Sequence, residues 1–281
     1  MKLPFKVDLS NEVVAITGAG GVLMSEFAKA LAACGAKVAV LDISEDGIKR
    51  TVDAITADGG EAFGVKTNCL VKADIERARD EIVAKYGDVT LLINGAGGNS
   101  PKATCDNEYM SKDISSDVKS FFDLDEQGFR FVFDLNIMSA VYCSQVFAKT
   151  MSEKGRGNII NISSMNAYRP LTKIPAYSAA KAGVSNFTEW LAVHFAPVGI
   201  RCNAIAPGFF ATNQNRSLLF NEDGTPTART GKILRSTPMN RFGETSDLLG
   251  ALLYLASDDA SGFVTGICIA VDGGFNAYSG V

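Results

Sequence analysis

The stretch VVAITGAGGVLMSEFAKALAACGAKVAVLD, residues 13–42, contains three patterns in succession. The apolar run at 13–16 is typical of a buried strand, and it stops at a glycine-rich loop. Residues 25–34 then place apolar side chains at helical spacing, and Gly35 ends that pattern. A second apolar run at 38–41 leads to Asp42. The order strand, helix, strand predicts a βαβ unit with parallel strands.

The loop TGAGGVLM, residues 17–24, departs from two known glycine spacings. A G-x-G-x-x-G pattern begun at Gly18 requires glycine where the chain has leucine, and T-G-x-x-x-G-x-G requires glycine at Val22 and Met24. The loop nevertheless joins a strand to a helix, where backbone N–H groups and the helix dipole attract a pyrophosphate. We therefore expect its three glycines to approach a dinucleotide closely, Val22 to keep a negative φ, and Met24 to hold its helix slightly off the sheet.

Asp42 stands 22 residues after Gly20, at the end of the second strand, where a carboxylate can accept hydrogen bonds from ribose hydroxyls. The same carboxylate would repel a 2′-phosphate by about 4 kcal/mol for unit charges about 4 Å apart at an effective dielectric constant of about 20. No Arg or Lys at 19–21 or 43–44 offsets that repulsion. The residues therefore favour NAD over NADP. A cap on the turn before Ser44 is the alternative interpretation of Asp42.

Further apolar runs follow at 62–66, 89–94, 158–163, 201–206 and 267–271, with helical patterns between them. Continuous apolar strands joined by helices indicate a parallel sheet that is covered on both faces. The chain has no internal repeat and no linker rich in Pro, Gly or Ser. We predict an α/β fold, a single doubly wound Rossmann-type domain over residues 1–281 with a central parallel sheet flanked by helices.

Composition argues against several classes of protein and site. The formal net charge is −4 and the 27 Lys and Arg residues form no basic run, which argues against a nucleic-acid surface. No apolar run reaches the roughly 18 residues of a membrane span, and the N-terminus lacks a signal-peptide core, so we expect a soluble cytoplasmic protein. Six widely spaced cysteines and a single histidine, His194, predict no metal site. We expect His194 to be packed or at an interface.

Candidate catalytic residues lie in NIINISSMNAYRPLTKIPAYSAAKAGV, residues 158–184. Tyr177 and Lys181 are four positions apart in a helical pattern, so their side chains share one face. A free tyrosine has a pKa near 10, and a neighbouring ammonium would lower that pKa by about three units at most. Ser164, at the end of the preceding strand, could hydrogen-bond a reacting oxygen. A Tyr-x-x-x-Lys pair by itself is weak evidence, because most such pairs face solvent.

Several motifs together resemble the short-chain dehydrogenase/reductase family over nearly the whole chain. They are TGAGG at 17–21, NGAG at 94–97, LN ending at Asn136, Ser164, YSAAK at 177–181, and Pro-Gly at 207–208 followed by Thr212. The resemblance implies hydride transfer with NAD and the catalytic residues Asn136, Ser164, Tyr177 and Lys181. It implies that Tyr177 is the acid and base, that Ser164 orients the oxygen, and that Asn136 supports a proton relay. Lys181 would lower the Tyr177 pKa and bind the nicotinamide ribose.

The expected NAD site combines loop glycines, strand ends and the Pro-Gly segment. This expectation follows from the glycine loop, from Asp42 and from the resemblance. Its members are Gly18, Gly20, Gly21, Val22, Leu23, Asp42, Ile43, Asn68, Cys69, Asn94, Gly95, Ala96, Tyr177, Lys181, Pro207, Gly208, Phe210 and Thr212. The resemblance implies that the Pro-Gly segment meets the nicotinamide, with Thr212 near its carboxamide, and that Asn68 lies by the adenine.

Two long segments are expected to shape the substrate site. Residues 99–128 form an insertion, for which a functional loop and a disordered surface both remain open, and residues 209–243 form a substrate loop or lid. The polar side chains nearby suit a hydroxyl-rich substrate with a carboxylate better than a steroid or lipid. Arg169 and Lys173 could instead be solvated loop charges. The expected substrate-binding residues are Asn99, Ser164, Asn166, Arg169, Gln214 and Arg216.

At a finer level, INGAGGN at 93–99, SSMNAYRPLTKIPAYSAAK at 163–181 and GGFNAYSGV at 273–281 resemble the D-mannonate oxidoreductase (D-fructuronate reductase) branch of the family. The resemblance implies interconversion of D-mannonate and D-fructuronate. A gluconate, keto-gluconate or polyol dehydrogenase is the alternative within the same chemistry, and a non-catalytic NAD-binding regulator is the alternative from another class. The resemblance, together with the apolar side chains of residues 184–195, also implies a homotetramer.

Overall fold

The stretch at 13–42 folds as strand β1 (Val13–Thr17), helix α1 (Val22–Ala33) and strand β2 (Lys37–Asp42). These elements come from a computed structural model that describes residues 7–212 and 216–280. The two strands are parallel neighbours, with Val13 opposite Lys37 and Thr17 opposite Leu41. Every residue of β1 is buried, as the continuous apolar run predicts for a strand that is covered on both faces.

All the strands of the described chain form one parallel sheet in the order β3-β2-β1-β4-β5-β6-β7. The other strands are β3 (Glu61–Lys66), β4 (Leu91–Asn94), β5 (Gly157–Ile162), β6 (Ile200–Pro207) and β7 (Cys268–Val271). The predicted doubly wound fold is confirmed. The strand order reverses between β1 and β4, and a ligand crevice is expected outside the carboxyl ends of strands at such a point.

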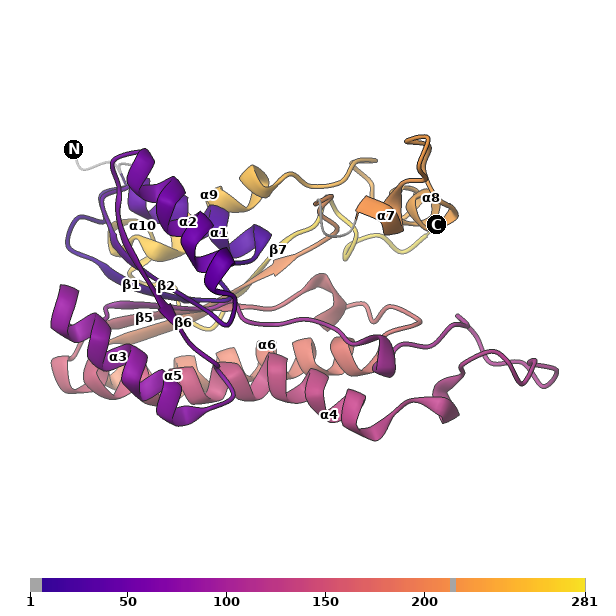
Figure 1. Cartoon of the computed structure of the whole chain (residues 1–281), viewed down its shortest axis with the longest axis horizontal. Coiled ribbons are helices and arrows are strands. Elements are labelled where there is room, and N and C mark those ends of the chain that lie inside the picture. Colours follow the sequence, from indigo (N-terminus) through magenta and orange to yellow (C-terminus); the bar gives the residue numbers. More distant parts are fainter. Residues whose placement is uncertain (1–6, 213–215, 281) are drawn as a thin grey trace.

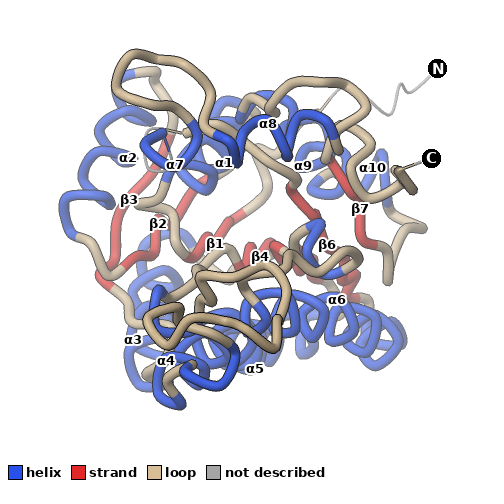
Figure 2. The backbone as a smooth tube through the Cα atoms, turned by 90° about the vertical axis from the view of Figure 1, so that its right-hand side faces the viewer, coloured by secondary structure: helices blue, strands red, loops and turns tan. Residues whose placement is uncertain are grey.

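Helices cover both faces of the sheet (Figures 1 and 2). One face carries α1, α2 and α9, and the other carries α3, α5 and α6. The helices after α1 are α2 (Glu45–Ala57), α3 (Lys72–Tyr86), α4 (Glu126–Phe133), α5 (Ser139–Lys154), α6 (Pro175–Phe195), α7 (Arg216–Leu219), α8 (Ala228–Arg235), α9 (Leu249–Ala256) and α10 (Asp258–Ser261). Two buried apolar clusters fill the space between helices and sheet, one on each face.

The insertion at 99–128 is a folded loop that leads into α4, and in Figure 1 it extends beyond that helix, away from the sheet. It contains two short 3-10 turns, Pro101–Ala103 and Phe121–Asp123. The N–H of Asp106 donates to the Lys119 carbonyl at 2.8 Å, and the N–H of Cys105 donates to the Lys173 carbonyl at 2.8 Å. The second bond ties the insertion to the segment just before α6, so the insertion is an ordered loop, and its functional role stays a prediction.

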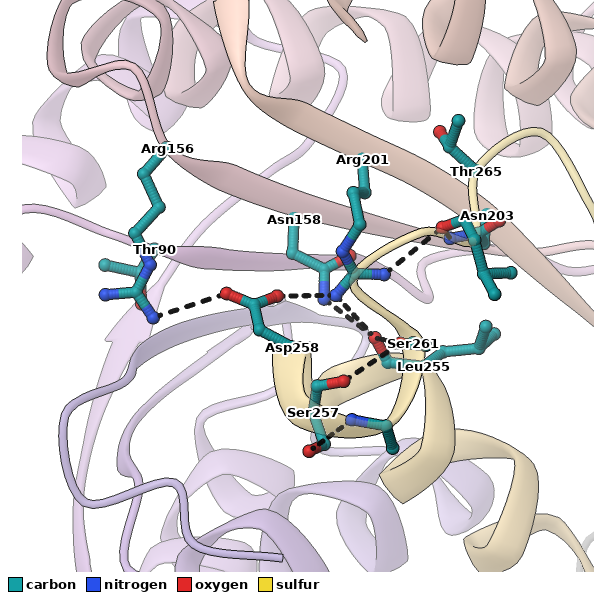
Figure 3. A network of polar contacts seen from close by, with 12 residues as sticks. Thr90, Arg156, Asn158, Arg201, Asn203, Leu255, Ser257, Asp258, Ser261 and Thr265 are labelled. Carbon is teal, nitrogen blue, oxygen red and sulfur yellow. Dashed lines mark hydrogen bonds and ion pairs between the residues drawn. The ribbon is translucent and has the colours of Figure 1, made fainter. Parts of the chain in front are cut away.

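A network of polar side chains joins the amino ends of several strands (Figure 3). The guanidinium of Arg201, which is 9% exposed, donates to the Leu255 carbonyl at 3.1 Å and to Asp258 Oδ1 at 2.7 Å. The Asn158 amide donates to the same carbonyl at 2.9 Å, and Arg156 lies 3.6 Å from Asp258 Oδ2. The network therefore fastens β5 and β6 to the α9–α10 segment at the end of the sheet opposite the strands' carboxyl termini.

One continuous helical stretch, Glu126–Lys154, is long and apolar enough by composition to cross a membrane, with a mean hydropathy of 1.3 in its most apolar window. Half of that window is buried inside the protein. The stretch consists of α4, a π-helical turn and α5, and α5 packs against β4, β5 and β6. Its apolar character is therefore explained by the core beneath it.

Candidate active site

A cleft of about 550 Å³ lies at the carboxyl ends of β1 to β5, beside the point where the strand order reverses. Its walls are the loops that follow β1, β2, β3 and β4, together with side chains of α4 and α6. Twelve of the residues predicted to bind NAD line it: Gly18, Gly21, Val22, Leu23, Asp42, Ile43, Asn68, Cys69, Gly95, Ala96, Tyr177 and Lys181. The tertiary structure thus brings the predicted cofactor residues of four separate loops to one place.

The glycines of the first loop have different tasks. Gly18 has a φ of +70°, and a Cβ there would lie 3.0 Å from Ala96 Cα, so only glycine fits against the loop after β4. Gly21 precedes α1 and has no side-chain cap, which leaves the helix N-terminus open toward the cleft for an anion.

Gly20 does not line the cleft, contrary to the prediction. Its N–H donates to Asp42 Oδ2 at 2.9 Å, and a Cβ on Gly47 would lie 2.9 Å from Gly20 Cα. The close approach that Gly20 permits is therefore to the start of α2.

The two residues that replace glycines in the loop are accommodated without distortion. Val22 keeps a negative φ, as predicted, since within the described residues only Asn240 among the non-glycine residues has a positive one. Met24 is 4% exposed and packs in the core. A Cβ on Gly95 would lie 2.2 Å from Met24 Sδ, so the thioether fills the space above that glycine. Room for Met24 is thus supplied by Gly95 in the loop after β4.

Asp42 both lines the cleft and organises the loops around it. Its Oδ2 accepts from the N–H of Gly20 at 2.9 Å, and its Oδ1 accepts from the N–H of Ser44 at 2.9 Å. The carboxylate therefore caps the turn, as the alternative interpretation holds, and it also lines the cleft, where its binding to ribose hydroxyls stays a prediction. The strand partner of Asp42, Lys66, is engaged by Glu45 at 2.9 Å, and in the described part of the chain no ion pair to Asp42 offsets its charge toward a 2′-phosphate.

Other predicted cofactor residues lie away from the cleft. The Asn94 side chain is buried, and its amide donates to Ser144 Oγ at 3.1 Å and Asn161 Oδ1 at 2.8 Å, because at the last position of β4 it points into the interior. Pro207, Gly208 and Thr212 lie at or just beyond the end of β6. Phe210 is buried and lines a separate cavity of about 350 Å³.

Sequence reasoning missed eight residues that line the cleft. Several follow strands directly, so their position at a carboxyl strand end was the available signal, whereas Phe131 on α4 and Leu135 in the π-helical turn have no such signal. The eight are Met24, Thr67, Leu70, Gly97, Gly98, Phe131, Leu135 and Ile162.

Tyr177 lies in the first turn of α6, which begins at Pro175, and its phenol reaches the Ser164 hydroxyl at the end of β5. Burial raises the pKa of Tyr177 above its usual value, and the hydrogen bond with Ser164 opposes that rise. The expectation that Lys181 brings the Tyr177 pKa down to neutrality is therefore not met in the chain without a ligand. Burial of the ring outweighs the hydrogen bond with Ser164, and with a raised pKa Tyr177 keeps its proton near pH 7.

Lys181 lies one helical turn beyond Tyr177 and is 4% exposed. Its Nζ donates to the Ile162 carbonyl at 2.7 Å and lies 5.7 Å from the centroid of the Tyr177 ring. Burial lowers the pKa of Lys181 to about 8. The predicted common face of the helix is confirmed, and it places an amine and a phenol side by side at the cleft.

Asn136 lies in a π-helical turn, Asp134–Met138, between α4 and α5. Its amide donates to the Gly98 and Val132 carbonyls at 2.7 Å each, and its Oδ1 accepts from the N–H of Gly98 at 3.2 Å. A Cβ on Gly97 would lie 2.7 Å from Asn136 Oδ1 and 3.1 Å from Lys181 Nζ. Asn136 therefore holds the loop after β4 close to the amine of Lys181.

The residues predicted to bind substrate are placed as follows. Ser164 and Asn166 are buried beside each other, and Asn166 Oδ1 has no hydrogen-bond partner in the described part of the chain. The exposed Asn99 amide donates to Thr104 Oγ1 at 2.9 Å, and Arg169 donates to the Tyr168 carbonyl at 3.1 Å. Arg216 packs its guanidinium 5.5 Å from the centroid of the Phe220 ring, and Gln214 lies outside the described residues.

The residues at the cleft fit a dinucleotide. The open N-terminus of α1 suits the pyrophosphate, the Asp42 carboxylate suits a ribose diol, and the phenol and amine of α6 lie in the same cleft. Such a group, when bound, supplies a hydride donor or acceptor. A neutral phenol, a serine hydroxyl and a buried amine beside it can exchange a proton with an alcohol or a carbonyl oxygen.

Comparison with known proteins agrees with this geometry. The family model described as enoyl-(acyl carrier protein) reductase matches residues 24–276. A Haemophilus influenzae protein provisionally named a D-mannonate oxidoreductase, whose structure contains NAD, is 53% identical with a TM-score of 0.94, and each chain is covered in full. An uncharacterized oxidoreductase, UxuB, from Bacillus subtilis is 52% identical over 99% of this chain and 100% of its own.

Relatives at about one third identity act on different molecules. A 7α-hydroxysteroid dehydrogenase from Escherichia coli is 32% identical over 95% of this chain and 94% of its own. A 2-dehydro-3-deoxy-D-gluconate 5-dehydrogenase from the same organism is 33% identical over 96% of this chain and 97% of its own. Identity at this level therefore indicates the family and does not by itself define a substrate.

Proposed function

Because the chain belongs to the short-chain dehydrogenase/reductase family and its cofactor is NAD, we propose that it interconverts a sugar-acid alcohol and its ketone. The substrate pair is D-mannonate and D-fructuronate. The observation that carries the proposal is that Tyr177 and Lys181 line one cleft with the dinucleotide-binding loops, while Ser164 hydrogen-bonds the Tyr177 phenol.

Tyr177 is the acid in the reduction of the ketone. Its pKa is raised by burial, so near neutral pH the phenol holds the proton that the developing alkoxide requires. Ser164 hydrogen-bonds the same phenol and is placed to orient the carbonyl oxygen. In the reverse direction Tyr177 must first lose its proton, so oxidation of the alcohol is favoured at higher pH.

Lys181 and Asn136 support the acid. The Lys181 amine, with its pKa lowered to about 8, can exchange a proton near neutral pH and lies next to the Tyr177 ring. Asn136 keeps the loop at Gly98 against this amine through hydrogen bonds to both backbone groups of Gly98. These residues form the proposed path by which the phenol regains its proton.

Two features support a sugar acid as substrate. Ser164 hydrogen-bonds the Tyr177 phenol, and Asn166 Oδ1, buried and without a hydrogen-bond partner in the described part of the chain, can accept a bond from a substrate hydroxyl. The relative with 53% identity carries the name of a D-mannonate oxidoreductase, and a more distant one acts on a keto-deoxy-gluconate.

The second candidate is a gluconate, keto-gluconate or polyol dehydrogenase, which the gluconate-related relative favours. A non-catalytic NAD-binding regulator has no chemical need for Ser164, Tyr177, Lys181 and Asn136 together.

The test is a reductase assay with purified protein, NADH and either D-fructuronate or 5-keto-gluconate. We expect NADH to be consumed faster with D-fructuronate. Tyr177→Phe removes the proton donor and should lower kcat by about 10²-fold or more, while NADH still binds. Tyr254→Phe, on α9 at the other face of the sheet, is the matched control and should retain wild-type kcat. Binding of NADH without turnover of any keto-acid would support the regulator instead.

The protein is further proposed to be a cytoplasmic homotetramer. The α6 face beyond the cleft exposes Trp190 and Val193 to 55% and 79%, and His194 stacks on Trp190 with ring centroids 4.5 Å apart. This apolar face supports self-association, and His194, which stacks on Trp190, would then lie at the interface.

A further inference from the structure

A second cavity, of about 320 Å³, lies between the insertion, the segment before α6 and helix α8. Its charged lining residues are Glu108, Lys173, Arg229 and Lys232, and we call it the basic cavity. Apolar side chains, among them Ile174 and Phe209, form the rest of its wall. Three cations against one carboxylate give the described lining a net positive charge, and the apolar wall strengthens the attraction for an anion by excluding water.

The basic cavity already binds a carboxylate of the protein. Lys232 Nζ donates to Glu108 Oε1 at 2.6 Å, and both Lys232 and Lys173 lower the pKa of Glu108. Lys173 and Arg229 have no side-chain hydrogen bond or ion pair elsewhere in the described part of the chain. Arg229 is also in the first turn of α8, where the helix dipole favours negative charge. After Glu108 is paired with Lys232, two cations remain for a second anion.

The basic cavity lies at the same edge of the sheet as the catalytic residues. Lys173 and Ile174 immediately precede α6, whose first turn contains Tyr177. Phe209 follows the Pro-Gly pair at the carboxyl end of β6, the same edge of the sheet at which Ser164 follows β5. A small substrate whose carbonyl carbon is at Tyr177 can therefore extend toward Lys173.

Two of the three cations named from the sequence are engaged in other contacts, and Lys173 is the third. Arg169 donates to the neighbouring Tyr168 carbonyl, and Arg216 packs on the Phe220 ring. We propose that Lys173 and Arg229 bind the carboxylate of the sugar-acid substrate, while Glu108 holds Lys232. This inference rests on the proposed function, and it names the residues that select an acid over a neutral polyol. Arg229 is suited to bind both carboxylate oxygens, and Lys173 adds a point charge.

The test compares Arg229→Gln and Lys173→Gln with wild type in the NAD-dependent oxidation of D-mannonate and of its neutral counterpart D-mannitol. We expect each substitution to raise KM for D-mannonate at least tenfold, to change kcat less than threefold, and to leave KM for D-mannitol unchanged. The matched control is Arg235→Gln, because Arg235 is exposed on the same helix and does not line the basic cavity. It should behave as wild type with both substrates.

A binding measurement separates this inference from the proposed function. Calorimetry of D-mannonate with the enzyme–NAD complex should show binding that Arg229→Gln weakens at least tenfold. If D-mannonate is not oxidised but binds in this Arg229-dependent way, the proposed function is wrong and the carboxylate subsite stands. If D-mannonate is oxidised and both variants keep the wild-type KM, the subsite is wrong and the function stands.

Discussion

Lys181 is a buried cation whose amine has a single hydrogen bond among the described residues, to the Ile162 carbonyl. Burial of an ammonium costs free energy, and the lowered pKa of about 8 measures that cost. Below pH 8 both the folded and the unfolded chain hold the proton, so the folded state carries the full penalty. Between pH 8 and the usual lysine pKa the folded state releases its proton first, so the free energy of unfolding from this residue rises with pH.

Lys181→Met removes the buried charge and keeps an apolar chain of similar length. In the cofactor-free protein we expect it to raise the free energy of unfolding at pH 7 by about 1–3 kcal/mol. The free-energy cost of leaving the Ile162 carbonyl without its hydrogen-bond donor reduces this gain. The advantage should shrink as pH rises from about 8 toward 10. Urea unfolding of wild type and variant across that range measures it. Lys149→Met, at an exposed position of α5, should show no such pH dependence. A Lys181→Met protein that is less stable than wild type at pH 7 would contradict this account.

At the scale of elements, the π-helical turn between α4 and α5 turns Asn136 toward the loop after β4. The Asn136 side chain donates to the Val132 carbonyl within the helix and to the Gly98 carbonyl, and its Oδ1 accepts from the Gly98 N–H. One side chain thus joins a helix to a loop that lines the cofactor cleft. π-helical turns often occur at functional sites, and here the turn supplies the reach that an α-helical residue would lack.

Asn136→Ala should loosen that loop. We expect the free energy of unfolding to fall by about 1–3 kcal/mol, because the Gly98 groups lose their partner, and the Kd for NAD to rise about tenfold. Hydrogen exchange at the Gly98 amide should become faster, which a defect confined to proton transfer would not cause. Asn99→Ala, whose amide is exposed and bonds Thr104, is the control and should leave exchange at Gly98 unchanged. Unchanged Gly98 exchange in Asn136→Ala would show that the loop is held by other contacts.

On the scale of the whole molecule, the stabilising polar network and the catalytic site lie at opposite ends of the strands. The network of Arg201, Asn158 and Asp258 lies at the amino ends of β5 and β6 (Figure 3). Ser164 and the cofactor cleft lie at the carboxyl ends of the strands. A substitution at the amino ends can therefore change the free energy of unfolding without changing kcat or KM.

Arg201→Met should lower the free energy of unfolding by about 1–3 kcal/mol. The value is below that of a fully buried pair because the Asp258 side chain is 52% exposed and keeps Arg156 as a partner. Chemical unfolding measures the loss, and kcat and KM at low temperature should match wild type. Lys49→Met breaks an ion pair whose members are 73% and 60% exposed, and it should change stability by less than about 0.5 kcal/mol. A shift in KM with unchanged stability would show that the two ends of the sheet are coupled.

Much of this arrangement could be predicted from local patterns. Each apolar run became a strand of the sheet, and Tyr177 and Lys181 share a helix face because residues four apart in a helix always do. Gly18 could be singled out because a loop between strand and helix needs a residue that tolerates positive φ. These features depend on neighbours along the chain.

Other features could not be predicted because they depend on distant contacts. Asn94 was expected at the cofactor, yet its amide bonds Asn161, 67 positions away. Cys69 and Cys143 are far apart in the sequence, but a hydrogen bond between them raises the pKa of the Cys143 thiol. The basic cavity joins Glu108 to Lys232, which are 124 positions apart. No local pattern encodes such pairs.

The sequence by itself determined the doubly wound sheet, the phosphate-binding end of β1 and the phenol–amine pair of α6. Apolar runs that alternate with helical patterns, glycines that tolerate positive φ, and the spacing of residues along a helix are all local physical properties. Only the tertiary structure decided how Gly20 and Met24 are used and which cations line the basic cavity. Those outcomes depend on how the loops after β1, β4 and β6 pack on one another once the sheet has brought them to one edge.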